Sequence, residues 1–553
     1  MSTAATRHRL WAAAVFALTV ALTVLAQPGR DLAAFAYAFA VPAIFWAFLR
    51  PPARLYAATL LAANAAAWTL ILAWLHNVTL GGLLLLGPFV GAWNALWFLA
   101  VRWTMPRLPG RPAPQRLLAL LALAALWVLI EWSRSWLLGG FPWLPLAATQ
   151  WKQLVILQTA SLAGAYGVSF ILVAFNIAFA AYAHRLLLEG NRRGLSRRSQ
   201  EFLLALLLLL GSFSLFLSET FGRARFDAPV GNFAVLQPAI PQSVKWDPAK
   251  VPLILDTLQS LSRQAAATNP DLLLWPESAL PYPLAGNLPA ARQMAAWTRA
   301  LASQINRPVL TGAEAVQTAP DGSNRWFNSV ALVTPDGVAA PLYAKRRLVP
   351  FGEFVPFRPL LGWLSKITDV GEGDYSPGDA PVLITTGGHA IAPLVCYEDT
   401  YPRLARDSVR AGAALLFVAT NNGWFGSGDA AFQHAAHSVL RAVENRRPVL
   451  RAGNSGWSGW IDEYGAIRAV LTQTADGQIR HTPPGRDDDP GTIYFRGTQT
   501  IAVTADTRWI GRQSFYTRHG DWFVALCALL VPAGWLATKT SPPTPAPAKR
   551  LMS

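Results

Sequence analysis

The chain has 553 residues, of which 53% are hydrophobic and only 14% are charged, and its net charge is +16. A water-soluble core cannot bury so much apolar surface, so part of the chain is expected to face lipid. Its two cysteines exclude a disulfide scaffold and a four-cysteine zinc site, and we expect neither a metal nor a cofactor.

Eight apolar runs approach the roughly 20 residues that a membrane span requires. They lie at 10–27, 32–49, 55–75, 80–101, 117–133, 163–183, 202–218 and 520–537. The first run also has features of a signal peptide, but further spans follow at short intervals, which favours a retained helix. The sequence thus predicts transmembrane helices 1–7 within 1–222, helix 8 within 516–540, and a disordered cytoplasmic tail at 541–553.

Basic residues concentrate in alternate loops between these runs. The loops carry Arg7 and Arg9; Arg50 and Arg54; Arg102, Arg107, Arg111 and Arg116; Arg185, Arg192, Arg193, Arg197 and Arg198; and Lys539, Lys549 and Arg550. The positive-inside rule places such loops in the cytoplasm. Eight spans that start inside also end inside, so both termini are expected to be cytoplasmic. Because no basic patch gathers on a soluble domain, nucleic-acid binding is not expected.

The sequence changes in character between residues 223 and 515. Short β-type runs at 233–236, 272–275, 309–312, 330–334, 391–395 and 415–419 alternate with helix-like stretches at 253–267 and 430–445. This alternation is typical of a layered α/β domain. The topology of the spans places this domain on the periplasmic side of the membrane.

Cys396 lies where the apolar run 391–395 ends and before a predicted helix near Tyr401. A cysteine on such a turn is lifted out of the sheet, and a nearby helix N-terminus favours the thiolate. The alternative is a buried structural cysteine, but polar neighbours at 397–399 argue against it. Cys527 lies inside the last apolar run, so a disulfide with Cys396 is not expected.

Two further charged residues follow strand-like runs. Glu277 comes after the buried run 272–275, where a poorly solvated carboxylate beside Trp275 would have a raised pKa suited to a general base. Lys345 is a candidate for stabilising an oxyanion, with Glu353 orienting it. Alternatively, Glu277 is an acidic turn residue that caps the next segment, and Lys345 lies in a solvated surface turn.

Together, the motifs Trp275-Pro-Glu277, Tyr343-Ala-Lys345 and Cys396-Tyr-Glu398 resemble the nitrilase superfamily, whose members use a Glu-Lys-Cys triad. The resemblance implies that Glu277, Lys345 and Cys396 are catalytic. It also implies an α/β fold, a nitrilase-like α-β-β-α sandwich domain on an eight-helix transmembrane bundle, with residues 223–515 forming the catalytic domain.

Motifs along nearly the whole chain narrow this resemblance to the apolipoprotein N-acyltransferases, the membrane-embedded branch of the superfamily. They are Glu131-Trp-Ser-Arg134, Gly140-Phe-Pro-Trp143, and the segments 237–246, 350–356, 421–426 and 441–451. Where relatives commonly read Asn-Asp-Ala-Trp-Phe-Gly, this chain reads Asn421-Asn-Gly-Trp-Phe-Gly426, which leaves any role of position 422 in doubt.

The family resemblance implies a two-step reaction in the bacterial inner membrane. Cys396 takes an acyl group from a glycerophospholipid, and the α-amino group of a diacylglyceryl apolipoprotein then receives it, completing lipoprotein maturation. Residues expected to bind substrate or support the site are Trp246, Glu353, Tyr397, Glu398, Trp424 and Trp143. The enzyme is expected to contact membrane lipids and to be monomeric.

Three segments leave alternatives open. Residues 354–366 are interpreted as an arm that dips into the membrane interface, the alternative being a core-packing helix. The turn at 141–143 is interpreted as re-entrant and as lining a lipid path. Glu131 and Arg134 are interpreted as a structural ion pair rather than as catalytic groups.

Two rival functions remain. A membrane-anchored amidase of the nitrilase type that hydrolyses a small C–N substrate would share the triad, but it would need neither eight spans nor the 354–366 arm. A transporter or receptor with an inactive soluble domain is disfavoured, because the spans lack the intramembrane acids and bases of ion-coupled carriers.

Overall fold

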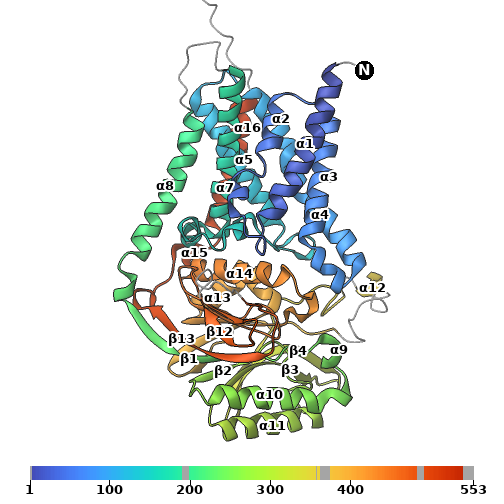
Figure 1. The fold of residues 1–553 in the computed structure, drawn as a ribbon, viewed down its shortest axis with the longest axis vertical. Coiled ribbons are helices and arrows are strands. Elements are labelled where there is room, and N and C mark those ends of the chain that lie inside the picture. Colours follow the sequence, from blue (N-terminus) through green and yellow to red (C-terminus); the bar gives the residue numbers. More distant parts are fainter. Residues whose placement is uncertain (1–2, 190–198, 356–357, 362–373, 483–490, 540–553) are drawn as a thin grey trace, which may run out of the picture. The chain divides into compact units, whose positions relative to one another are not determined.

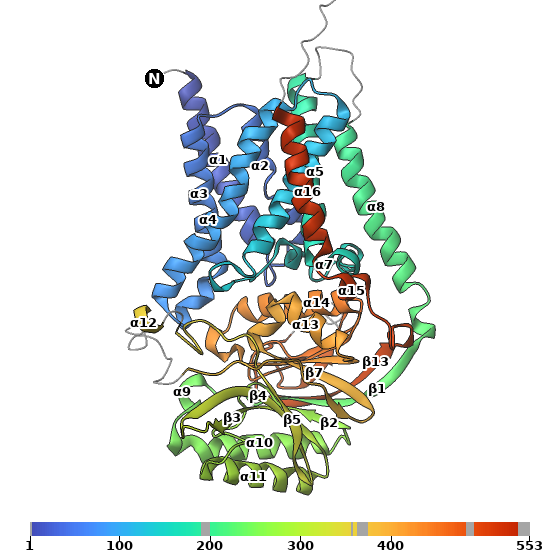
Figure 2. The same ribbon diagram turned by 180° about the vertical axis from the view of Figure 1, so that it is seen from behind.

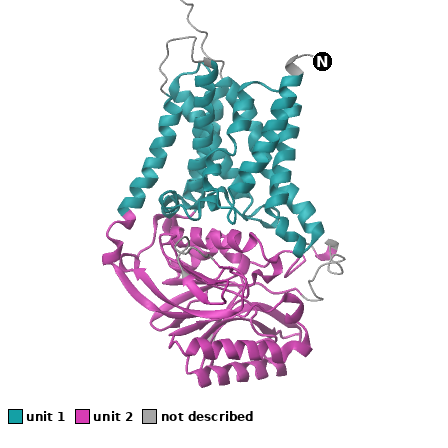
Figure 3. Ribbon diagram, in the orientation of Figure 1, with its two compact units in different colours: residues 1–218, 521–553 teal, residues 219–520 magenta. Residues whose placement is uncertain are grey.

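A computed structural model describes residues 3–189, 199–355, 358–361, 374–482 and 491–539. The chain divides into two compact units, unit 1 with residues 1–218 and 521–553 and unit 2 with residues 219–520 (Figure 3). The predicted tail at 541–553 and most of the predicted 354–366 arm lie outside the described residues.

Unit 1 is helical (Figures 1 and 2). Its α-helices are α1 (Thr3–Leu25), α2 (Val41–Phe48), α3 (Ala53–Ile71), α4 (Leu80–Thr104), α5 (Ala113–Ser133), α6 (Leu154–Leu157), α7 (Ala160–His184), α8 (Gln200–Thr220) and α16 (Trp522–Lys539). Shorter helical turns are η1 (Ala33–Tyr37), η2 (Ala73–Asn77), η3 (Met105–Arg107), η4 (Leu137–Gly139), η5 (Leu146–Gln150) and η6 (Arg185–Glu189).

Six helices among the described residues are long and apolar enough to cross a membrane. They are Thr6–Leu25, Leu80–Arg107, Ala113–Ser133, Ala160–Leu188, Gln200–Arg225 and Trp522–Lys539. The run predicted as a span at 32–49 is not one helix, because η1 ends at Tyr37 and α2 starts at Val41. Pro42 lies in the first turn of α2, where it has no N–H to continue a preceding helix. The count of eight spans therefore stays a prediction.

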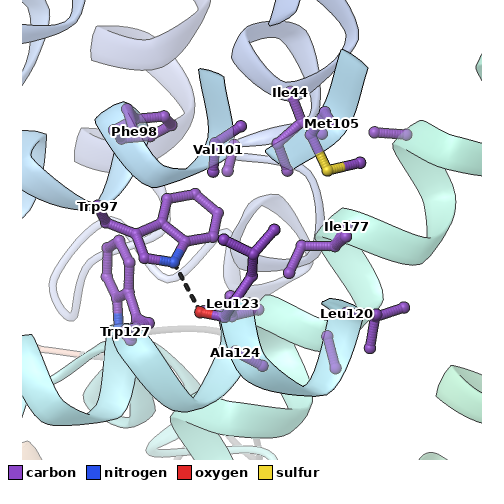
Figure 4. Close-up of a cluster of buried hydrophobic side chains, with 14 of the residues drawn as sticks. Ile44, Trp97, Phe98, Val101, Met105, Leu120, Leu123, Ala124, Trp127 and Ile177 are labelled. Atoms are coloured by element: carbon purple, nitrogen blue, oxygen red, sulfur yellow. Dashed lines mark hydrogen bonds between the residues drawn. The ribbon is translucent and has the colours of Figure 1, made fainter. Parts of the chain in front are cut away.

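Aromatic and aliphatic side chains pack together in a buried cluster of unit 1 (Figure 4). The indole of Trp97 is fully buried, and its N–H donates to the carbonyl oxygen of Leu123 at 2.8 Å. Trp127 meets Trp97 edge to face, with ring centroids 5.4 Å apart. A buried indole needs a partner for its one polar atom, so this bond explains why Trp97 can pack here.

Helices α3 and α4 approach each other closely at Gly91. A Cβ on Gly91 would lie 2.5 Å from the carbonyl carbon of Asn64 and 2.6 Å from the Cα of Ala65. Small residues allow such backbone contact between membrane helices. We therefore expect Gly91→Ala to lower the free energy of unfolding by about 1–3 kcal/mol, which outweighs the roughly 1 kcal/mol that alanine gains in a helix.

Thermal unfolding of the detergent-solubilised protein measures this effect. The matched control is Gly211→Ala in α8, where a Cβ would meet nothing within 4 Å. Gly91→Ala should melt at a lower temperature and Gly211→Ala at an unchanged or higher one. Equal melting temperatures would contradict the close contact.

Glu131 and Arg134, at the end of α5, hold the segment 141–146. A carboxylate oxygen of Glu131 accepts from the backbone N–H of Leu146 at 2.6 Å. The guanidinium of Arg134 donates to the carbonyl oxygen of Trp143 at 3.0 Å and stacks over the ring of Trp68 at 4.9 Å. Both side chains thus have a structural role in fixing this turn.

Unit 2 contains two sheets. The first has the strand order β13-β1-β2-β3-β4-β5 and the second β12-β11-β10-β9-β8-β7-β6. The strands are β1 (Asp227–Gln237), β2 (Leu272–Leu274), β3 (Val309–Thr318), β4 (Asn324–Thr334), β5 (Gly337–Ala344), β6 (Ile384–Thr386), β7 (His389–Val395), β8 (Leu415–Thr420), β9 (Val449–Gly453), β10 (Gly459–Ile461), β11 (Ile467–Gln473), β12 (Ile479–Thr482) and β13 (Gly497–Asp506).

Helices cover the outer faces of the two sheets. The helical elements of unit 2 are η7 (Arg223–Arg225), α9 (Gln242–Lys245), η8 (Pro248–Lys250), α10 (Val251–Ala266), α11 (Pro289–Ile305), α12 (Arg358–Leu361), η10 (Cys396–Thr400), α13 (Pro402–Arg410), η11 (Asn422–Phe425), α14 (Ala430–Asn445), η12 (Thr507–Trp509) and α15 (Phe515–His519). α10 and α11 pack on the first sheet, and α13 and α14 on the second (Figures 1 and 2).

Successive side chains along β1 and β2 point to opposite faces of the first sheet. This alternation explains why the sheet packs against the second sheet on one face and against helices on the other. Phe233, Val235 and Leu272 point into the core between the two sheets. Ala234 and Leu273 point into the core beneath α10 and α11. Strands buried on both faces carry apolar residues at every position. The predicted α-β-β-α sandwich is confirmed.

Candidate active site

Glu277, Lys345 and Cys396 each follow the end of a strand in unit 2. Glu277 lies three residues beyond β2, while Lys345 directly follows β5 and Cys396 directly follows β7. The first sheet thus supplies the acid and the amine, and the second supplies the thiol. Polar groups at the carboxyl ends of strands are free of the ladder and available for chemistry.

The three predicted catalytic side chains belong to one cluster. The ammonium of Lys345 donates to a carboxylate oxygen of Glu277 at 3.4 Å and to one of Glu353 at 2.9 Å. Both Glu277 and Lys345 act electrostatically on the thiol of Cys396, the carboxylate raising the thiol pKa and the ammonium lowering it. All three are buried, with exposed fractions of 7%, 1% and 9% for Glu277, Lys345 and Cys396.

A glycine on β3 allows the Glu277 turn to lie close to the sheet. A Cβ on Gly312 would stand 2.6 Å from both the Cα of Glu277 and the carbonyl oxygen of Pro276. The carbonyl oxygen of Gly312 also accepts from the N–H of Ala279 at 2.9 Å. Because only glycine leaves this space, β3 fixes the position of the acid.

Cys396 has a strained backbone. Its φ is +51°, in the left-handed region that residues with a Cβ rarely adopt. Below it, the Nε2–H of His434 lies 3.1 Å from the carbonyl oxygen of Cys396 and 3.0 Å from a carboxylate oxygen of Asp399. Asp399 also accepts from Ser438 and from Arg451, at 2.6 and 2.5 Å. This buried network holds the turn in its strained form.

The structure reverses two expectations about pKa values. Burial raises the pKa of Cys396 to about 12, and the nearby charge of Glu277 adds to this. α13 begins only at Pro402, so its N-terminus does not adjoin the thiol. Burial also favours neutral Glu277, but Lys345 and Asn328 outweigh it and hold the pKa of Glu277 below its ordinary value. The thiol is therefore protonated at rest beside an ionised carboxylate.

Glu398 ties the Lys345 segment to the Cys396 turn. One of its carboxylate oxygens accepts from the hydroxyl of Tyr343 at 2.6 Å and from the N–H of Val395 at 2.7 Å. The other accepts from the N–H of Arg346 at 2.6 Å. Glu398 is fully buried, so its position suits support of the site rather than contact with substrate.

The remaining predicted support residues differ in their surroundings. Glu353 bonds Lys345 and accepts from the N–H of Val349 at 2.8 Å. Tyr397 is buried and meets Tyr401 edge to face. Trp246 is 48% exposed, and Trp424 on η11 is partly buried. Trp143 belongs to unit 1, where its buried indole packs against Trp74 and Phe141.

Several residues of this site were not predicted from the sequence. The side-chain amide of Asn328 donates to Glu277 and to Glu353, both at 2.9 Å, and so bridges the two carboxylates. Lys245 donates to the carbonyl oxygen of Glu277 at 3.2 Å. A polar residue inside the apolar strand β4 was a signal for Asn328. Lys245 precedes Trp246 in a motif already noted, but no rule of spacing singles it out.

Two family models match the chain. Residues 9–178 match the apolipoprotein N-acyltransferase N-terminal domain, and residues 233–482 match the carbon-nitrogen hydrolase family. A protein of Geobacter metallireducens named apolipoprotein N-acyltransferase is 34% identical over 74% of this chain and 72% of its own length. Proteins of the same name from Pseudomonas paraeruginosa and Shewanella oneidensis are 34% and 30% identical over 73% and 66% of this chain, and over 75% and 68% of their own lengths.

Among solved structures, an amidase from Nesterenkonia sp. is similar to part of the chain. It is 18% identical, with a TM-score of 0.36, and the match covers 54% of this chain and 96% of the amidase.

Proposed function

Since the chain belongs to the apolipoprotein N-acyltransferase family, we propose that it forms an acyl thioester on Cys396 and passes the acyl group to an amine. It is an acyltransferase and a multi-pass membrane protein whose substrates are lipids and lipoproteins. The observation that carries the proposal is the buried cluster in which Glu277 and Lys345 pair at 3.4 Å and both act electrostatically on the buried thiol of Cys396.

In the first step, the sulfur of Cys396 attacks the ester carbonyl of a glycerophospholipid. Glu277 takes the thiol proton as the S–C bond forms, which avoids a free buried thiolate. Lys345 stabilises the oxyanion of the tetrahedral intermediate. The C–O bond then breaks, and Glu277 returns the proton to the leaving alcohol of the lysophospholipid. The product is an acyl-thioester enzyme.

In the second step, the free α-amino group of a diacylglyceryl apolipoprotein attacks the thioester. Glu277 accepts a proton from the amine, Lys345 again stabilises the oxyanion, and the C–S bond breaks. The thiolate of Cys396 takes the proton back from Glu277, and the acceptor leaves as an amide. No cofactor or metal takes part in this scheme.

Trp246, Trp424, Tyr397 and Trp143 are proposed to contact the lipid substrates, and Glu353 and Glu398 to support the triad. Extracting a lipid costs about 0.8 kcal/mol for each CH₂ group transferred to water, so an enzyme embedded beside its substrates avoids a large penalty. The basic loops support a bacterial inner-membrane location with both termini cytoplasmic and the catalytic unit periplasmic. We propose that the enzyme acts as a monomer.

A trapping experiment tests the proposal. The purified protein is incubated with phospholipid labelled in its acyl chain, and an acyl adduct released by hydroxylamine is expected. Cys396→Ala should form no adduct. Cys527→Ala, which removes the only other cysteine and leaves the site intact, should form it normally.

Adding an acceptor then identifies the second step. A diacylglyceryl lipopeptide with a free amino terminus should receive the label, and its N-acetylated form should not. An adduct that persists in Cys396→Ala would refute the thioester. Release of the label only to water, with the free lipopeptide present, would favour an amidase-like hydrolase instead.

A further inference from the structure

A second buried ammonium lies beside the proposed triad, and the reaction described above gives it no role. Lys245 ends the short helix α9 and is 4% exposed, whereas its neighbour Trp246 is 48% exposed. Its ammonium donates to the backbone carbonyl oxygen of Glu277 at 3.2 Å. Burying a charge costs free energy unless the charge interacts with an opposite charge. The burial of Lys245 therefore indicates that acidic groups lie near its ammonium.

The groups that act electrostatically on the ammonium of Lys245 come from three elements. They are Glu277 from the turn after β2, Glu314 from β3, and the thiol of Cys396 from the turn after β7. Glu314 is itself buried, and one of its carboxylate oxygens accepts from the hydroxyl of Tyr375. Lys245 is therefore placed among acids, with the reacting thiol nearby.

Glu277 has a second acid close to it. Glu353 shares with Glu277 both the ammonium of Lys345, at 2.9 and 3.4 Å, and the amide of Asn328, at 2.9 Å from each. Two carboxylates that share a site repel, which raises the pKa of one of them. A single ammonium between two acids leaves one negative charge uncompensated, and Lys245, which also interacts with Glu314, adds a second positive charge near Glu277.

We propose that Lys245 is a positioning residue for acyl transfer: it fixes the peptide of Glu277 through its carbonyl oxygen and keeps the Glu277 carboxylate ionised, ready to take the thiol proton. The inference rests on the proposed function, because acyl transfer through Cys396 gives Glu277 its role as a base. Lys345 differs from Lys245 in two respects. Lys345 contacts the carboxylates directly, and its proposed role is to stabilise the oxyanion.

Removing the positive charge of Lys245 is expected to change how the rate of acyl-adduct formation depends on pH. In Lys245→Met the pKa of Glu277 rises, so the acid limb of the pH–rate profile moves up by about one unit, and the rate below that limb falls about tenfold. On the alkaline side, burial lowers the pKa of Lys245 to about 8, even though Glu277 and Glu314 oppose the shift. Loss of its proton removes the charge assistance from its hydrogen bond to the carbonyl oxygen of Glu277, so the wild-type rate should decline above about pH 8.

The experiment measures the rate of adduct formation on full-length protein in phospholipid micelles between about pH 3 and about pH 9. Lys245→Met should show the shifted acid limb and no decline near pH 8. The matched control, Lys250→Met, removes an exposed lysine at the end of η8 and should reproduce the wild-type profile. A pH–rate profile of Lys245→Met with the same shape as that of wild type would overturn the proposal, whatever the absolute rate.

Lys245→Arg tests the proposal independently if the methionine variant fails to fold. Arginine stays charged throughout this pH range. The acid limb should stay in place and the decline near pH 8 should vanish; an unchanged decline would overturn the role of Lys245. Failure of the proposed function looks different, because wild type itself would then form no Cys396-dependent adduct.

Discussion

Glu277→Gln is expected to slow acyl-adduct formation on Cys396 by about 10²- to 10⁴-fold, the usual contribution of a general base. The amide keeps the size of the carboxylate but cannot take the thiol proton. Because burial holds the pKa of the thiol at about 12, almost no thiolate is present at neutral pH to react unaided. Stopped-time assays with labelled phospholipid measure the rate.

A second variant separates loss of the base from a general effect of removing an acid. Asp256→Asn changes an exposed acid on α10 and should leave the rate unchanged. Both variants should melt like wild type to within a few degrees. If Glu277→Gln formed the adduct at nearly the wild-type rate, Glu277 would not be the base.

Among the substitutions proposed for this protein, Asp399→Asn is expected to lower the free energy of unfolding the most. Its carboxylate accepts from His434, Ser438 and Arg451, and all four side chains are buried. Asp399 is the counter-ion of Arg451 among the described residues. Leaving a buried charge unpaired costs about 3–5 kcal/mol. Thermal unfolding should show a fall in Tm of roughly 5–15 °C.

A partly exposed acid of the same type provides the comparison. Asp407 on α13 pairs with Arg403 at 3.5 Å, and the side chain of Arg403 is 80% exposed. Asp407→Asn should change the free energy of unfolding by less than about 1 kcal/mol, as for other surface pairs. Adding Arg451→Met to Asp399→Asn should recover part of the stability. A Tm equal to that of wild type in Asp399→Asn would show that Arg451 has another counter-ion.

The layered arrangement of sheets and helices in unit 2 could be predicted from the sequence, because short stretches of sequence indicate each strand and helix. Short apolar runs such as 233–236 and 272–275 alternate with helical stretches, and strands with apolar residues at every position must be covered on both faces. Similar logic located most of the apolar helices. It failed at 32–49, where mean hydropathy cannot show that the helix is interrupted before Pro42.

The electrostatics of the site could not be predicted from the sequence. Glu277 was expected to have a raised pKa beside Trp275, and Cys396 a lowered one near a helix N-terminus. Both directions were wrong, because Lys345 and Asn328 lie against Glu277 while burial keeps the thiol of Cys396 neutral. A pKa depends on groups within a few ångströms, and sequence spacing does not give those distances.

By itself, the sequence determined which residue types are available and where strands and apolar helices form, because propensity and periodicity act over short stretches of chain. It therefore selected Glu277, Lys345 and Cys396 as residues that follow strands. Only the tertiary structure decided what surrounds them: Asn328 between two acids, Lys245 behind Glu277, and His434 beneath Cys396. These contacts join residues 25 to 51 positions apart in the sequence, and only the tertiary fold brings them together.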